Sequence, residues 1–91
     1  MTREGTEGAA KPAGSGVKPI AAALKTLALL ELIGRSERPQ RMVDLARASG
    51  ESAPTTYQKL LTLVQAGWVE QTDDGRYRLS FLAVQMGQAA L

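Results

Sequence analysis

Residues 20–33 form one apolar run, and this run constrains the fold more than any other feature of the sequence. Its alanines, leucines and isoleucines are interrupted only by Lys25, Thr26 and Glu31. On a helical wheel, one face carries Ile20, Ala23, Leu24, Leu27 and Leu30. The opposite face carries Ala22, Leu29 and Ile33. A helix that is apolar nearly all round must be covered from two sides. We therefore expect the first face to pack on the domain's own core and the second to form the interface of a homodimer.

Glycines and turn signals divide the rest of the chain into short segments. Gly34 is expected to end the first helix. Residues 42–49 and 53–66 show helical periodicity, and they stop at Gly50 and Gly67. The sequence therefore predicts two further helices joined by a tight turn.

A hairpin and a last helix follow. Residues 68–71 and 77–79 alternate as strands do, and the Thr-Asp-Asp-Gly segment between them is a strong hairpin signal. Residues 81–91 return to helical periodicity. The expected fold is mainly α with a small β-hairpin: a winged helix-turn-helix with three helices, a two-stranded wing and a C-terminal linker helix.

Three segments are expected. The glycine-rich residues 1–18 have too few apolar side chains to offset their ordering entropy, so they are expected to form a disordered arm. Residues 19–79 form the winged helix-turn-helix domain, and residues 80–91 begin the linker helix. We expect a fragment of a longer regulator.

Composition excludes several classes of protein. The sequence has no histidine and no cysteine, so it lacks the commonest general base and the commonest zinc ligands. The carboxylates are scattered over separate segments and no phosphate-binding loop appears, which argues against an enzyme, a metal site or a cofactor. No apolar stretch is long enough for a membrane span, and no signal peptide precedes the first helix, so we expect a cytoplasmic, nucleoid-associated protein. A net charge of +2 is weak evidence for nucleic acid.

The third predicted helix carries two stripes. The apolar stripe, expected to face the core, consists of Tyr57, Leu60, Leu61 and Val64. The polar stripe consists of Thr55, Gln58, Lys59 and Thr62, at helical spacing. Its hydroxyl, amide and ammonium groups suit base edges in the major groove, where glutamine pairs with adenine and lysine reaches guanine or a phosphate. A polar stripe alone is more often a solvated surface; its place between a short helix and a basic hairpin favours DNA.

Basic residues around this helix are expected to bind phosphates. Lys25, Arg41 and Arg76 border it, while Ser52 is expected to cap it and to approach a phosphate. Arg78 has an equally good alternative, an ion pair with Glu70 across the hairpin. The residues predicted to contact DNA are therefore Lys25, Arg41, Ser52, Thr55, Gln58, Lys59, Thr62 and Arg76.

In five segments the chain resembles the N-terminal domain of the IclR family of transcriptional regulators. Residues 25–33 are similar to the family's first helix, and residues 44–50 to its second helix and turn. Residues 60–71 resemble the end of its recognition helix and first wing strand, while 75–79 and 86–91 resemble the second strand and the linker helix. The resemblance implies dimeric repressors or activators of transcription that bind double-stranded operator DNA. It also implies a small-molecule effector that binds a C-terminal domain missing from this chain.

Three departures from the family pattern affect the site. Arg41 stands where a serine or threonine is common. Pro54 and Thr55 stand where serine and then threonine are frequent, so only Thr55 matches the family pattern. Gln58 replaces a frequent arginine, so we expect a different operator base. The main alternative is a winged-helix module that only dimerises, for which the apolar first helix is equally suited; such a module has no need of the polar stripe.

Overall fold

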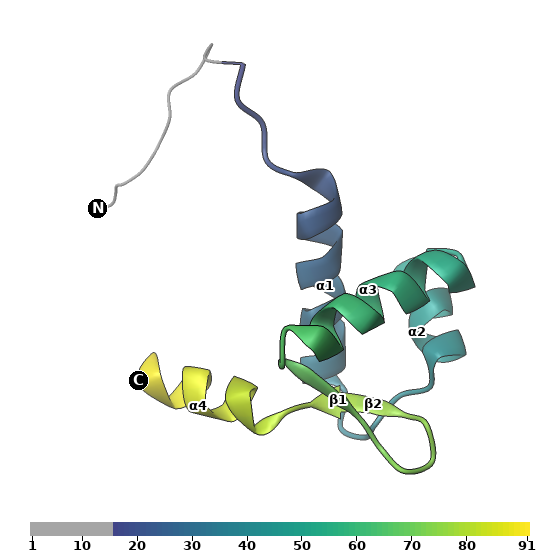
Figure 1. Cartoon of the computed structure of the whole chain (residues 1–91), viewed down its shortest axis with the longest axis vertical. Helices are drawn as coiled ribbons and strands as arrows, with labels where there is room; N and C mark the ends of the chain where they lie inside the picture. Colours follow the sequence, from purple (N-terminus) through teal and green to yellow (C-terminus); the bar gives the residue numbers. More distant parts are fainter. Residues whose placement is uncertain (1–15) are drawn as a thin grey trace.

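The computed structural model describes residues 16–91, so most of the predicted arm lies outside the described residues. The elements, in chain order (Figure 1), are α1 Ala21–Arg35, α2 Met42–Ser49, α3 Ala53–Gln65, β1 Val69–Gln71, β2 Tyr77–Leu79 and α4 Phe81–Ala89. The expected fold class is confirmed, because the described chain is mainly helical with one two-stranded hairpin.

The two faces of α1 are the reverse of those expected. Leu29 and Ile33, assigned to the subunit interface, are each only 3% exposed and belong to the core. Leu24 and Leu27, assigned to the core, are 55% and 57% exposed. Both faces are apolar, so periodicity alone could not choose between them; the choice is made by α2, α3 and β2, which pack on α1. The predicted interface is therefore wrong for Leu29 and Ile33.

Gly34 does not end the first helix, which continues to Arg35. A Cβ at Gly34 would lie 3.2 Å from Cδ1 of Leu79, so the missing side chain lets β2 approach α1 closely. Ser36 follows the end of the helix, and its hydroxyl donates a hydrogen bond of 2.8 Å to the carbonyl of Leu32 in the last turn. The Gly34 prediction failed because a glycine in a helix also marks a close contact.

The turn between α2 and α3 follows from two residues. Gly50 has φ +75°, the left-handed conformation that suits glycine, and its N–H donates to the carbonyls of Ala46 and Arg47. Ser52 then caps α3 by accepting a hydrogen bond from the Thr55 N–H at 3.3 Å. The predicted cap is confirmed, and it sets the direction in which α3 leaves the turn.

The hairpin is joined by a third short segment. β1 and β2 pair antiparallel, with Glu70 opposite Arg78. Gln40, in the loop before α2, forms an isolated bridge to Tyr77 through two backbone hydrogen bonds of 2.9 and 2.8 Å. This bridge fixes the start of α2 against the wing.

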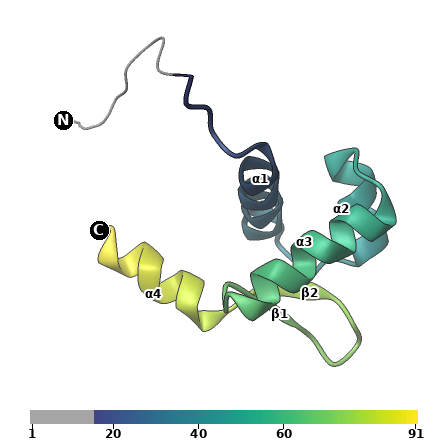
Figure 2. The ribbon, with the colours of Figure 1, turned by 45° about the horizontal axis from the view of Figure 1, so that its top comes forward.

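The core lies where α1, α2, α3 and the hairpin meet. It is built from Leu29, Ile33, Leu45, Leu60, Leu63, Val69 and Tyr77. Thr56 is buried among them, and its hydroxyl donates to the Ser52 carbonyl at 2.9 Å, so its buried donor has a partner. By contrast, α4 has no buried residue and extends away from the three-helix body (Figure 2).

Candidate nucleic-acid interface

The outward side of α3 differs from the predicted stripe. Tyr57 and Leu61, expected in the core, are 46% and 47% exposed. Thr56 and Leu63 are buried in their place. The error arises because an apolar side chain on a helix is not always an inward one. Gln58, Leu61 and Thr62 are exposed together, and Gln58 therefore lies on the open surface as predicted.

One edge of α3 faces α1. A groove of about 400 Å³ between the two helices is lined by Ala22, Ala23, Thr26, Thr55, Gln58, Lys59 and Thr62. The four polar residues predicted as one stripe thus do share one surface. Ala22, expected in the dimer interface, lies on this groove instead. The Thr62 hydroxyl is already used, because it donates to the Gln58 carbonyl at 2.9 Å.

The other edge of α3 faces the wing. Tyr57 lies close enough to Tyr77 to act on its ionisation: burial, and to a smaller extent Tyr57, raise the pKa of Tyr77. Tyr57, Leu61 and Gln58 therefore follow one another around α3 from the wing side to its outermost line. The outward surface of α3 therefore exposes the ring of Tyr57, the isobutyl group of Leu61 and the amide of Gln58.

The first turn of α3 is largely satisfied by its own residues. The Ser52 hydroxyl accepts from the Thr55 N–H and donates to the Thr55 hydroxyl at 2.9 Å. Pro54 has no N–H. Within the described residues, the Ala53 N–H is the first-turn amide left for an anion, so the predicted phosphate role of Ser52 rests on a single neighbouring donor.

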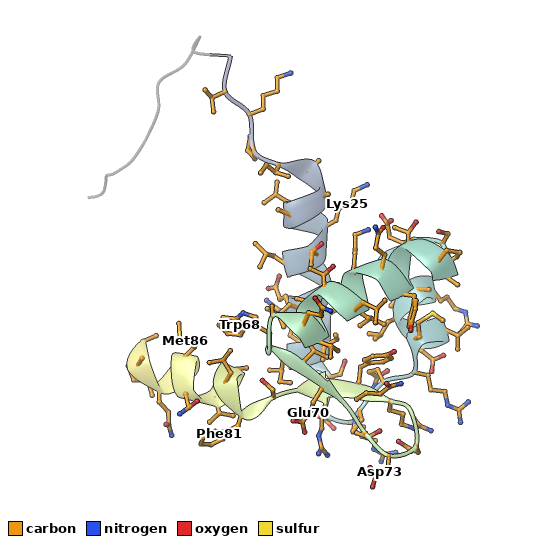
Figure 3. All side chains as sticks on the ribbon, in the orientation of Figure 1. Lys25, Trp68, Glu70, Asp73, Phe81 and Met86 are labelled. Atoms are coloured by element: carbon orange, nitrogen blue, oxygen red, sulfur yellow. The ribbon has the colours of Figure 1, made fainter. Side chains whose placement is uncertain are left out.

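Glu51 ties two of the predicted DNA-binding lysines together. Its carboxylate lies 3.2 Å from Nζ of Lys59 and 3.5 Å from Nζ of Lys25. The hydrogen bond from Lys59, and then the charge of Lys25, lower the pKa of Glu51. The Lys59 side chain is only 11% exposed, so it turns toward Glu51 and not outward to a base edge as predicted. Lys25 is 63% exposed and extends from α1 on the α3 side (Figure 3).

The wing neutralises its own arginines. Nε of Arg78 lies 2.7 Å from Glu70, so the alternative role considered for Arg78 is confirmed. Nε of Arg76 lies 3.2 Å from Asp74. A hydrogen bond from the Thr72 hydroxyl is the main cause that lowers the pKa of Asp74. Asp73 lies at the tip of the wing (Figure 3). The wing therefore presents paired charges, with Arg76 available only by exchange of its partner.

In the described part of the chain, positive charge without an ion pair lies in the loop beside the wing and at Lys18, before α1. Among the described residues, the basic side chains without an ion pair are Lys18, Arg38 and Arg41. Arg41 was predicted as a phosphate contact, whereas Arg38 was missed. Its position in the sequence could have indicated it: Arg38 and Arg41 lie on either side of Gln40, which the bridge to Tyr77 holds against β2.

A family model for the IclR helix-turn-helix domain matches residues 22–73, which cover α1, α2, α3 and β1. The chain belongs to this IclR family. It is a winged helix-turn-helix of the kind that binds DNA in transcriptional regulators, as its resemblance implied. The search of curated proteins found no match.

Solved structures with the same fold include other IclR-type regulators. A putative IclR regulator from Silicibacter sp. is 28% identical, with a TM-score of 0.67 over 76% of this chain and 28% of that one. An IclR-family regulator from Brucella abortus is 24% identical, with a TM-score of 0.70 over 87% of this chain and 32% of that one. HmgR from Pseudomonas aeruginosa is 22% identical, with a TM-score of 0.72 over 78% and 30%. The chain spans about a third of the length of these structures.

Residues 16–91 contain no helix long and apolar enough to cross a membrane. Over the same residues, acidic side chains do not gather into a group that would hold a metal ion.

Proposed function

We propose that this domain binds double-stranded DNA sequence-specifically, with α3 as the recognition helix in the major groove. The observation that carries the proposal is the exposed amide of Gln58 on the outermost line of α3. A glutamine amide makes a bidentate pair with adenine in the major groove. Thr55 and Thr62 border it along the α1 groove, and the Thr62 hydroxyl, which donates to the Gln58 carbonyl, keeps its oxygen as an acceptor.

Phosphate binding is assigned first to Arg41 and Arg38, which have no ion pair within residues 16–91. Lys25 and Arg76 join them by exchanging a carboxylate partner for a phosphate. Exposed ion pairs are worth about 0–1 kcal/mol, so this exchange costs little. Ser52 orders the first turn of α3, whose Ala53 N–H approaches the backbone.

The regulator is proposed to act as a homodimer. The exposed apolar side chains of α1, of the residue before it and of α4 suit this role: they are Ile20, Leu24, Leu27, Phe81, Val84 and Met86. Figure 3 shows Phe81 and Met86 on different sides of α4, so one helix can contact both a partner and the body of the domain. A two-fold dimer would place its recognition helices about 34 Å apart, one helical turn of DNA, or a multiple of it.

The remaining functions of an IclR-type regulator lie outside this domain. A small-molecule effector is proposed to bind another part of the regulator, because the solved relatives are about three times as long as the part they share with this chain. Operator binding would then repress or activate transcription. No catalytic reaction, cofactor or metal is proposed for residues 16–91.

Selection of bound sequences from a duplex library with a randomised centre tests the proposal. Repeated selection with the 91-residue chain at one fixed salt concentration should enrich an inverted repeat. The rival function, a module that only dimerises, predicts a dimer with no enriched sequence. Salt must be fixed because nonspecific affinity changes steeply with it.

A further inference from the structure

Leu61 is a large aliphatic side chain on the outward side of α3, the side proposed to face DNA. It is 47% exposed on α3, three residues after Gln58 and four after Tyr57. These spacings put it on the same side of the helix as both neighbours. The core of the domain takes Leu60 and Leu63 from α3 and leaves Leu61 outside.

An isobutyl group has only one apolar partner at the base edges of the major groove, the 5-methyl group of thymine. The hydrogen-bonding groups of the other bases would be desolvated against Leu61 without compensation. A leucine beside Gln58 therefore discriminates among bases by the apolar contact that only thymine offers.

We infer that Leu61 is a second specificity-determining residue, which reads the methyl group of a thymine near the adenine read by Gln58. This inference rests on the proposed function and names one more element of the sequence that α3 selects. Three residues of helix rise about 4.5 Å, and base pairs are about 3.4 Å apart. The thymine should thus lie within about two base pairs of the adenine.

Tyr57 supports the contact from the wing side. Its ring is 46% exposed and, being one helical turn before Leu61, lies directly beside it on the helix surface. The pair forms a small apolar strip, Tyr57 and Leu61, between the polar outer line of α3 and the wing. Such a strip excludes water from a methyl contact.

The experiment removes the methyl group from the DNA. A duplex enriched by the selection described above is resynthesised with deoxyuridine in place of each thymine in turn, and affinity is measured at one salt concentration. At one thymine within about two base pairs of the Gln58-dependent adenine, uracil should weaken binding about fourfold per half-site, the value expected for one buried methyl group. Substituting both half-sites should give about 15-fold. Thymines outside the half-sites serve as controls and should show no change.

Variants of the protein test whether Leu61 is the residue that contacts the thymine methyl group. In Leu61→Ala, which keeps a good helix former at an exposed position, thymine and uracil should bind equally well at that site. Gln58→Ala is the matched control: it should bind more weakly but keep the difference between thymine and uracil. Circular dichroism confirms that both variants are folded.

Three outcomes would overturn the inference. Equal affinity for thymine and uracil at every position of an enriched duplex removes Leu61 from base reading and leaves the proposed function standing. A difference that persists in Leu61→Ala assigns the methyl contact to another residue. A library that enriches no sequence overturns the proposed function, and the inference with it.

Discussion

Glu51 shows how one side chain decides what its neighbours are free to do. From sequence, Lys25 and Lys59 are two cations beside a recognition helix. In the structure a single carboxylate holds both, within 3.5 Å of Lys25 and 3.2 Å of Lys59. The pair is formed across 26 and 8 residues of sequence through the turn before α3, which no pattern of charges along the chain predicts.

Removing the Glu51 charge should strengthen DNA binding. Glu51→Gln frees Lys25 and Lys59 to attract phosphates and removes a negative charge near the backbone, so affinity for any duplex should rise several-fold at low salt. Glu31→Gln is the matched control, since it makes the same charge change at the Arg35 pair on α1. Fluorescence anisotropy on random duplex measures both. Equal effects in the two variants would mean that Glu51 has no particular relation to the DNA surface.

The ion pairs of Glu51 with Lys25 and Lys59 depend on pH, because they need the carboxylate to be charged. Because its pKa is lowered in the folded domain, the stabilisation is fully present above the ordinary glutamate pKa and is lost as pH falls through the lowered one. At neutral pH Glu51 is therefore charged, and both ion pairs are formed. The comparison with Glu51→Gln therefore belongs at neutral pH.

The sequence pattern predicted where helices and strands lie better than which way their side chains face. Residues 42–49 were predicted and observed as a helix, and Ser52 as the cap of the next. Local rules decide such features. The orientation of α1 and the exposure of Leu61 depend instead on which other elements arrive, and those contacts are long-range. The prediction that Gly34 ends the first helix was wrong for the same reason, because Gly34 makes a long-range close approach to Leu79.

The turn before α3 should depend measurably on its cap. Ser52→Ala removes the acceptor for the Thr55 N–H and should cost about 1 kcal/mol of unfolding free energy. Ser49→Ala is the control, because the Ser49 hydroxyl bonds only the Ala46 carbonyl within its own helix. Urea denaturation followed by circular dichroism compares the two. A loss no greater in Ser52→Ala than in Ser49→Ala would show that the turn is held by packing alone.

The two apolar faces of α1 have different roles in the molecule. One face anchors the core through Leu29 and Ile33, while the other leaves Leu24 and Leu27 open. The N-terminal half of α1 and the whole of α4 extend from the body of the domain (Figure 1). These two helices carry the apolar surface expected of a dimer interface.

A charged side chain on each face should separate these duties. Leu27→Glu should leave the domain folded and give monomers with weaker DNA binding, because it puts a charge in the proposed interface. Leu29→Glu should unfold the domain, because the same charge would be buried at a position that is 3% exposed. Sedimentation velocity and circular dichroism report both results. A Leu27→Glu dimer as stable as the unmodified one would place the interface elsewhere.

We propose that α3 reads sequence through Gln58, and binding of the Gln58→Ala variant to two duplexes in one buffer tests this. Gln58→Ala should cost roughly 1–3 kcal/mol per half-site on the enriched duplex and almost nothing on random DNA. Anisotropy titrations of both duplexes at one salt concentration give the two numbers. Equal losses on the two duplexes, or none on either, would contradict the claim.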